Sequence, residues 1–307
     1  MGIICGLVLG TITARLLEMP LPGNELLLGV LLIGLIGFID DRFGPLSVAA
    51  RLAVQFFAAA LVVYRSGGLL RLPLPEPLDF PLGALSVPAA LLWMVAVTNV
   101  YNFLDGIDGS AALQGIVVGL AMGFLNLSGG LFTVIGFTVA GACAGFLIHN
   151  WHPAKVFMGD VGSGTLGFLL AALPFQVEST FRGQNVFLIA ICLWFFLSDG
   201  VFTIFRRLIR GEKVWHPHRS HLYQRLVQTG LRHDQVVVKV TSAAAVLASL
   251  AVMSARAGQS TVWWSVVVVA VGGFLVYYLW TWWRERHFAP TNQSKLSGTQ
   301  ITREYSR

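Results

Sequence analysis

The chain has 307 residues, of which 55% are hydrophobic and 12% are charged. Soluble domains carry about 25% charged residues, so this composition excludes an ordinary soluble domain and indicates a polytopic membrane protein. The net charge of +6 suits an anionic inner leaflet and needs no nucleic-acid partner to explain it. Cys5, Cys143 and Cys192 lie inside apolar runs, which favours packing over disulfides or zinc binding.

Apolar runs predict an all-α helical bundle with about ten transmembrane helices. A spanning helix needs about 20 apolar residues, and the first two runs fall short of that length. We expect residues 1–285 to form a single transmembrane domain and residues 286–307 to form a polar cytoplasmic tail. The predicted spans are 2–17, 24–39, 47–64, 83–100, 111–127, 131–149, 163–178, 185–204, 235–254 and 261–282.

Basic residues predict which ends of these spans face the cytoplasm. If the spans alternate across the bilayer, 16 of the 21 Lys and Arg residues fall on the side that carries Arg42. Basic residues favour the cytoplasmic side, so we assign that side to the cytoplasm. Three Asp motifs lie on the same side, although acids at a bilayer edge are costly unless they bind something.

The first motif is Asp40-Asp41, which closes the second span and is followed by Arg42. A solvated helix end with an ion pair would explain it. Two carboxylates at the mouth of a membrane site, one of them a base or a metal ligand, would explain it equally well. The pair resembles the start of the DDxxD motif of prenyl-diphosphate enzymes, but the fifth position here is Gly44.

The second motif follows the fourth span and is more specific. Its amides and acids stand three residues apart, which predicts that they share one side of a helical turn. Polar turns also use Asn, Asp and Gly, but this regular spacing at the bilayer edge favours a binding site. Two glycines would let a ligand approach the backbone closely. The residues are Asn99, Asn102, Asp105, Gly106, Asp108 and Gly109.

The third motif leads into the seventh span. Gly162 and Ser163 at a helix start expose free backbone N–H groups, which bind anions. Asp160, just before them, could hold a metal ion beside that anion, and Asn150 adds a polar group in the same loop. The alternative is an ordinary helix cap, because Asp and Ser cap helices routinely.

Two further groups of polar residues lie after the seventh span. Asp199 falls inside the eighth span, where it would either pair with a basic residue or contribute to the site. The long loop that follows carries His216, His218, Arg219 and His221. No cysteine or acid nearby completes a tetrahedral zinc set, so we interpret the His/Arg cluster as contacting phosphate or sugar oxygens.

Taken together, these motifs resemble those of the polyprenyl-phosphate N-acetylhexosamine-1-phosphate transferases, which form glycosyltransferase family 4 with phospho-MurNAc-pentapeptide translocase. The resemblance runs from about residue 30 to 225. It is carried by GFIDDRFG at 37–44, NVYNFLDGIDG at 99–109, HNWHPAKVFMGDVGS at 149–163 and HPHRSHLYQRL at 216–226. The form of the last motif resembles the branch that serves O-antigen or other surface glycans.

The resemblance implies a reaction, a cofactor and partners. The family transfers a sugar 1-phosphate from a UDP-sugar to undecaprenyl phosphate, releases UMP and uses Mg²⁺. It implies a multi-pass protein of a bacterial inner (plasma) membrane, in lipopolysaccharide or cell-wall synthesis, with its catalytic site facing the cytoplasm. The partners would be undecaprenyl phosphate, a UDP-N-acetyl sugar and the lipid bilayer, with no nucleic acid; assembly as a homodimer is left open.

Residue roles follow from the same motifs. We expect metal binding by Asp160 with Asp105 or Asp108. Catalytic roles are expected for the acids of the three Asp motifs, which are Asp40, Asp41, Asp105, Asp108 and Asp160. The Asp40-Asp41 pair would orient or deprotonate the lipid phosphate. Substrate contacts are expected from Asn99, Asn102, Asn150, Phe157, His216, His218, Arg219 and His221.

One departure from the family concerns the start of the chain. The family carries another span and a cytoplasmic loop before the helix that matches 2–17, and Met1 begins about where that loop should end. An inactive, N-terminally truncated fragment is therefore one alternative. A membrane transporter with an acidic site at the cytoplasmic face is another, although the acids gather at one face and show no inverted repeat.

Overall fold

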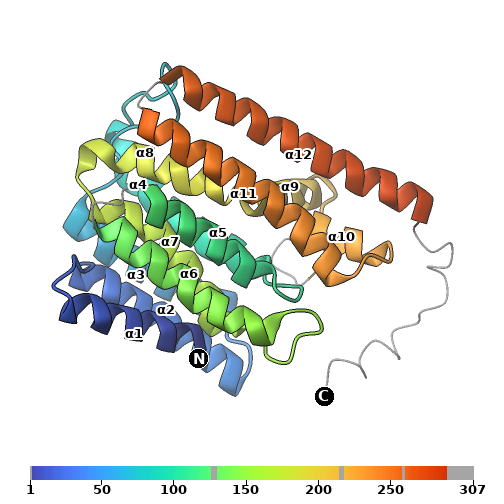
Figure 1. The fold of residues 1–307 in the computed structure, drawn as a ribbon, viewed down its shortest axis with the longest axis horizontal. Coiled ribbons are helices and arrows are strands. Elements are labelled where there is room, and N and C mark those ends of the chain that lie inside the picture. The colour runs from blue at the N-terminus through green and yellow to red at the C-terminus, as the bar shows by residue number, and fades with distance from the viewer. Residues whose placement is uncertain (1, 126–129, 214–217, 258–259, 289–307) are drawn as a thin grey trace.

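The computed structural model describes residues 2–125, 130–213, 218–257 and 260–288, and within these ranges it is helical. The regular elements run roughly along one axis (Figure 1), which matches the predicted all-α class. The described part of the chain contains no named strand and a single isolated bridge between Arg71 and Pro81. His216, for which we expect a substrate contact, lies outside the described residues. So do residues 289–307, which make up most of the predicted polar tail.

The first half of the chain forms helices close to the predicted spans. Short 3-10 turns, η1 (Gly83–Leu85) and η2 (Leu173–Gln176), extend α4 at its start and α7 at its end. The helices are α1 (Gly2–Leu16), α2 (Asn24–Phe43), α3 (Val48–Ser66), α4 (Ser86–Phe103), α5 (Ser110–Leu125), α6 (Leu131–Asn150) and α7 (Gly159–Ala172).

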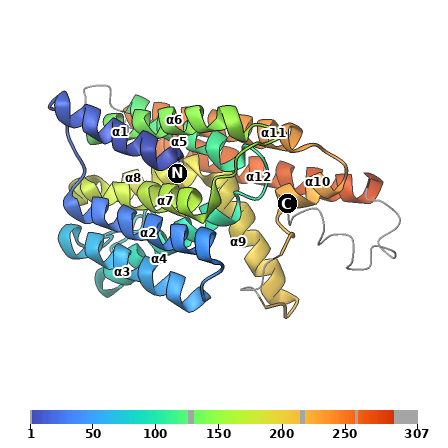
Figure 2. The same cartoon turned by 90° about the horizontal axis from the view of Figure 1, so that it is seen from below.

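The second half departs from the predicted spans in one place. The single span expected at 185–204 is two helices, α8 (Ser179–Cys192) and α9 (Trp194–Ile209), and the pair is bent by 78°. Figure 2 shows α9 leaving the direction of its neighbours. The remaining helices are α10 (Leu222–Gln228), α11 (His233–Ala257) and α12 (Ser260–Phe288).

The length and composition of the helices support a multi-pass membrane protein. Fewer of the described helices than the ten predicted spans are long and apolar enough to cross a membrane. Among the described helices, five are long and apolar enough to cross a membrane, and six if α8 and α9 count as one broken span. Several of the remaining predicted spans are shorter helices, such as α7 with 14 residues. The expected number of about ten spans therefore stays a prediction.

The helix α7 lies at the centre of the bundle. Every residue from Val161 to Ala172 is buried, and the helix packs against α2 and α4. A helix that is apolar all round belongs in such a position. Its first turn meets the last turns of α2 and α4 at the end of the bundle that also holds α10 (Figure 1), and the polar motifs converge there.

Candidate functional site

Four aspartates from three distant parts of the chain form an acidic cluster at this end of the bundle. Asp40 and Asp41 close α2, Asp105 lies in the loop after α4, and Asp160 lies in the first turn of α7. The carboxyl groups of Asp40 and Asp160 lie within hydrogen-bond reach of each other. The charges of Asp160 and Asp41 both act on Asp105.

Asp41 holds the start of α7. Its Oδ1 accepts a hydrogen bond from the Asp160 amide at 3.0 Å and its Oδ2 accepts one from the Val161 amide at 3.1 Å. These amides belong to the first turn of α7, where backbone donors lack helical partners. Gly159, with φ +68°, allows this contact, because a Cβ there would lie 2.4 Å from Asp41 Oδ2.

Two side chains tie the other acids together. Arg51, from the first turn of α3, lies 3.3 Å from Asp160 Oδ2 and 3.7 Å from Asp40 Oδ2. Asn102, from the last turn of α4, donates to Asp160 Oδ1 at 3.0 Å and to Ser163 Oγ at 2.8 Å. Asp40 also accepts from the Leu46 amide at 2.6 Å. The carboxylates are thus oriented from α2, α3, α4 and α7.

The acidic cluster carries more negative charge than its contacts neutralise. Burial, followed by the charges of Asp160 and Asp41, raises the pKa of Asp105 well above its usual range. Among the described residues, the Arg51 guanidinium pairs with two of the four carboxyl groups, those of Asp40 and Asp160, so a cation would relieve the repulsion within the cluster. Oxygen donors of this kind are the ligands that Mg²⁺ prefers, so Asp105 and Asp160 supply the donor type that the expected metal needs.

Asp108 belongs to a second cluster, with His152 and His233. Its Oδ2 lies 2.7 Å from His152 Nδ1 and 3.3 Å from His233 Nδ1, and it accepts from the Ala154 amide at 3.2 Å. Burial opposes the change, but these hydrogen bonds and the histidines hold the pKa of Asp108 below its usual range. The three side chains could hold a metal ion, and their nitrogen donors suit transition metals better than Mg²⁺.

The prediction that Asp105 and Asp108 share one side of a helical turn is wrong. α4 ends at Phe103, and residues 104–109 form an irregular loop before α5. The first acid of this loop faces the acidic cluster and the second faces the two histidines. Since α4 has already ended before Asp105, the two acids share no helical turn, and Gly109, with φ +78°, ends the loop just before α5 begins at Ser110.

The predicted amide contacts take different positions. Asn99 donates to Gln55 Oε1 on α3 at 2.6 Å and to the Val95 carbonyl at 2.7 Å, rather than to an acid of the cluster. Asn150 is buried; its Oδ1 accepts from the Gly109 amide at 3.0 Å and its amide donates to the Val156 carbonyl at 2.9 Å. It therefore joins the loops after α4 and α6. Phe157 is 74% exposed and lies two residues before α7, where it could stack on a ligand.

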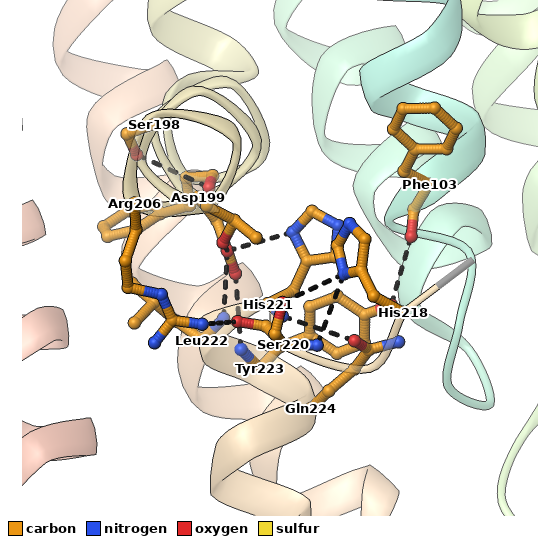
Figure 3. A network of polar contacts seen from close by, with 12 residues as sticks. Phe103, Ser198, Asp199, Arg206, His218, Ser220, His221, Leu222, Tyr223 and Gln224 are labelled. Carbon is orange, nitrogen blue, oxygen red and sulfur yellow. Dashed lines mark hydrogen bonds and ion pairs between the residues drawn. The ribbon is translucent and has the colours of Figure 1, made fainter. Parts of the chain in front are cut away.

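The described histidines before α10 lie in residues 218–221, which we call the histidine loop. His221 of this loop contacts Asp199 (Figure 3). His221 is buried and its Nδ1 lies 3.2 Å from Asp199 Oδ1. His218 is half-buried, and its Nδ1 lies 3.0 Å from Ser220 Oγ. Burial, with the charges of His221 and Arg207, lowers the pKa of His218 to about 4. His218 is thus neutral at pH 7, and positive charge on this surface comes from arginines, including the exposed Arg219.

Sequence reasoning missed four contacts. Arg51 was counted only as one of the basic residues on its side, yet its place in the first turn of an apolar helix is a usable signal. Gln55, one turn further along α3, could have been found in the same way. His152 lies inside the third motif, but nothing in the sequence pairs it with Asp108. His233 carries no sequence signal, because only the tertiary fold brings α11 to this loop.

Comparison with known proteins identifies the family of the chain. A family model described as glycosyl transferase family 4 matches residues 25–178, which contain all four members of the acidic cluster. Among curated relatives, a probable undecaprenyl-phosphate N-acetylglucosaminyl 1-phosphate transferase of Bacillus subtilis (strain 168) is 29% identical over 249 residues, 79% of this chain and 68% of the relative.

Two other relatives carry related names. A decaprenyl-phosphate N-acetylglucosaminephosphotransferase of Mycobacterium tuberculosis (strain CDC 1551 / Oshkosh) is 35% identical over 69% of this chain and 58% of the relative. A phospho-N-acetylmuramoyl-pentapeptide-transferase of Heliobacterium modesticaldum (strain ATCC 51547 / Ice1) is 39% identical over 48% of this chain and 50% of the relative. The chain spans half to two thirds of the length of these relatives. On the extent of the family match, the chain belongs to glycosyl transferase family 4.

Proposed function

We propose that this membrane protein transfers a sugar 1-phosphate from a UDP-sugar to undecaprenyl phosphate and releases UMP. The observation that carries the proposal is the acidic cluster, where carboxylates from α2, the α4–α5 loop and α7 gather with an excess of negative charge. Both substrates are phosphates, so a site for them needs a cation. Family membership and the names of the relatives support the same reaction class.

Mg²⁺ is the cation that we propose, held by Asp105 and Asp160. When bound there, it would supply charge neutralisation for the diphosphate and for the leaving UMP. Asn102 holds the Asp160 carboxylate in place through a hydrogen bond to Oδ1. The sequence also assigned Asp108 to this ion; its contacts with His152 and His233 instead favour a role in binding the substrate beside it.

The bond changes need one nucleophile and one leaving group. An oxygen of the lipid phosphate attacks the β-phosphorus of the UDP-sugar, and the P–O bond to the α-phosphate breaks as UMP leaves. Asp40 is proposed to orient the lipid phosphate or to take its proton, because its carboxyl stands beside Asp160. Asp41 is proposed to act through α7, since both of its oxygens accept amides of that helix.

The cellular setting follows from the sequence and the family. We propose a bacterial inner membrane location, with the acidic cluster at the cytoplasmic face where UDP-sugars are found. The sugar would be GlcNAc or a 6-deoxy N-acetylhexosamine, and the lipid product would initiate O-antigen or another surface glycan. The basic residues near the predicted cytoplasmic ends support this orientation.

The test gives purified protein undecaprenyl phosphate, a panel of UDP-N-acetyl sugars, and either Mg²⁺ or EDTA, and measures UMP. We expect UMP release with at least one sugar, only with Mg²⁺. Asp160→Asn should lower the rate at least about 100-fold, because an electrostatic contact to the transition state is lost. Asp79→Asn, which changes an acid paired with Arg71 outside the cluster, is the matched control and should keep full activity.

Two outcomes would contradict the proposal. One is binding of a UDP-sugar with no UMP release, which would favour transport over transfer. The other is near-normal turnover by a correctly inserted Asp160→Asn variant, which would remove the metal role of that residue.

A further inference from the structure

Asp199 is a fully buried acid that the proposed reaction leaves without a role. It lies in α9, and its Oδ1 accepts from Thr203 Oγ1 at 3.1 Å and from the Leu222 amide at 2.9 Å. Its Oδ2 accepts from the Tyr223 amide at 3.3 Å and from Tyr277 Oη at 3.2 Å. With His221 Nδ1 at 3.2 Å, five donors from three helices and a loop meet one carboxylate.

This set of partners fits an ionised carboxylate. All five are donors or, for His221, a ring nitrogen that can donate, and a carboxylate is acceptor-only when ionised. A buried charge is costly unless it is hydrogen-bonded. The contact with the amides of Leu222 and Tyr223 fixes where α10 begins (Figure 3).

Through His221, the carboxylate also orders the histidine loop. The His221 ring lies between His218, at 4.9 Å between ring centroids, and Tyr223, at 5.8 Å. Because His221 is buried and turned to Asp199, it cannot also reach a substrate phosphate with the same nitrogen. His218 is the half-buried ring of this stack, and the carbonyl of its neighbour Ser220 accepts from Arg206 at 2.7 Å.

The same helix start reaches the acidic cluster. Tyr223 Oη donates to the carbonyl of Phe103 at 3.1 Å, two residues before Asp105. Gly106 lies directly against it, since a Cβ there would stand 2.1 Å from that hydroxyl oxygen. A shift of α10 would therefore move both His218 and the loop that carries Asp105.

We propose that Asp199 is a positioning residue, which acts through His221 and Tyr223 to hold His218 and the Asp105 loop in one fixed arrangement for the transfer. Of the two histidines in the described part of this loop, His218 is the one that contacts the substrate, and His221 is its support. This inference rests on the proposed function for its kinetic readout. Its structural readout, amide exchange, needs no activity.

The kinetic test compares two variants that change the same set of contacts. Asp199→Asn keeps the shape but turns an N–H₂ group toward at least two of the donors, whichever way the amide lies. We expect kcat to fall at least about tenfold while KM for the UDP-sugar stays within about threefold, the pattern of a contact that serves the transition state. Tyr277→Phe removes one donor from α12, leaves the contacts to residues 221–223, and should keep near-normal kcat.

Two further comparisons separate positioning from a general structural role. His221→Asn retains a donor that can face Asp199 and should preserve more activity than His221→Ala. The double variant Asp199→Asn/His218→Ala should lose less activity than the product of the two single losses, because part of the effect of Asp199 passes through His218 and the rest passes through the Asp105 loop. If the two losses multiply instead, Asp199 does not act through His218 and the proposal falls.

Hydrogen exchange of the full-length protein in detergent gives the second measurement. Asp199→Asn should speed amide exchange within 218–228 and 104–109, leaving α2 and α7 unchanged, whereas Tyr277→Phe should not. Unchanged exchange in both segments would overturn the proposal even if the protein releases no UMP. Absence of UMP release with the expected exchange pattern would count against the proposed function only.

Discussion

The electrostatic character of the acidic cluster is set by individual carboxyl groups. Asp105 is affected by burial and by the charges of Asp160 and Asp41, whereas Asp108, three residues along, is held by two histidines and an amide. Neighbouring acids of one motif therefore have opposite shifts in pKa. A group that resists ionisation in the free protein is one whose ionised form gains most from a bound cation.

The raised pKa of Asp105 predicts a pH dependence with a definite sign. Between the usual carboxyl pKa and the raised value, the folded protein binds more protons than the unfolded chain, so stability falls as pH rises through that window. Thermal unfolding of metal-free protein should show this fall, and Asp105→Asn should remove it. Saturating Mg²⁺ should reverse the trend, because metal and proton compete for the carboxylate.

A flat profile of unfolding temperature against pH in the metal-free protein would contradict this account of Asp105. Loss of the profile in Asp108→Asn, with retention in Asp105→Asn, would assign the effect to the other cluster.

At the scale of elements, the site depends on how closely α2 and α7 approach. A Cβ at Gly37 would lie 2.6 Å from the Val161 amide nitrogen and 2.7 Å from the Asp160 carbonyl oxygen. These are backbone atoms, which cannot rotate away. The glycine before Asp40 therefore lets the last turn of α2 bring its acids to the first turn of α7.

Gly37→Ala should consequently push α7 from α2. Overpacking of a well-packed interface lowers the free energy of unfolding by about 1–3 kcal/mol. The displacement of Asp160 should in addition lower the rate of UMP release by more than this loss of stability explains. Thermal unfolding and UMP release would be measured together. Gly141→Ala is the matched control, since a Cβ on that glycine of α6 meets nothing within 4 Å and alanine favours a helix. Equal behaviour of the two variants would contradict the close-packing argument.

Hydropathy identified most of these elements but not their breaks. The apolar runs predict, to within a few residues, the positions of α2, α3, α4, α6, α11 and α12. Long helices of a membrane protein are visible in the sequence because each needs a continuous apolar run. The 78° bend between α8 and α9 leaves no signal in the hydropathy, since Leu193 at the break is as apolar as its neighbours. The short helix α10 falls in the loop predicted after the eighth span for a related reason: the carboxylate that accepts its first amides belongs to Asp199, 23 residues before Leu222.

For the whole molecule, the essential feature is that distant segments meet at one end of the bundle. The sequence placed all Asp motifs on one side by counting charges, and the structure brings Asp40, Asp41, Asp105 and Asp160 together there. Which acids share a cluster could not be predicted, because spacing along the chain does not determine side-chain direction in an irregular loop. The separate position of Asp108 is the clearest example.

The proposed reaction makes one phosphoanhydride bond and breaks another, so its equilibrium constant should lie within a few orders of magnitude of one. We therefore expect labelled UMP to exchange into UDP-sugar when the lipid product is present, in a Mg²⁺-dependent manner. The measurement is the label recovered in the UDP-sugar. An enzyme that turns over forward but shows no exchange would contradict simple reversible transfer.

In the proposed function, the acidic cluster holds one divalent ion, and this ion binds the diphosphate of the UDP-sugar. Mn²⁺ can replace Mg²⁺ as a magnetic probe of oxygen ligands, and its resonance reports nearby phosphorus nuclei. We predict one bound Mn²⁺ per chain that senses the ³¹P nuclei of the UDP-sugar, is lost in Asp160→Asn, and is kept in His152→Ala. Binding kept in Asp160→Asn but lost in His152→Ala, or a bound ion without any phosphorus coupling, would contradict the claim.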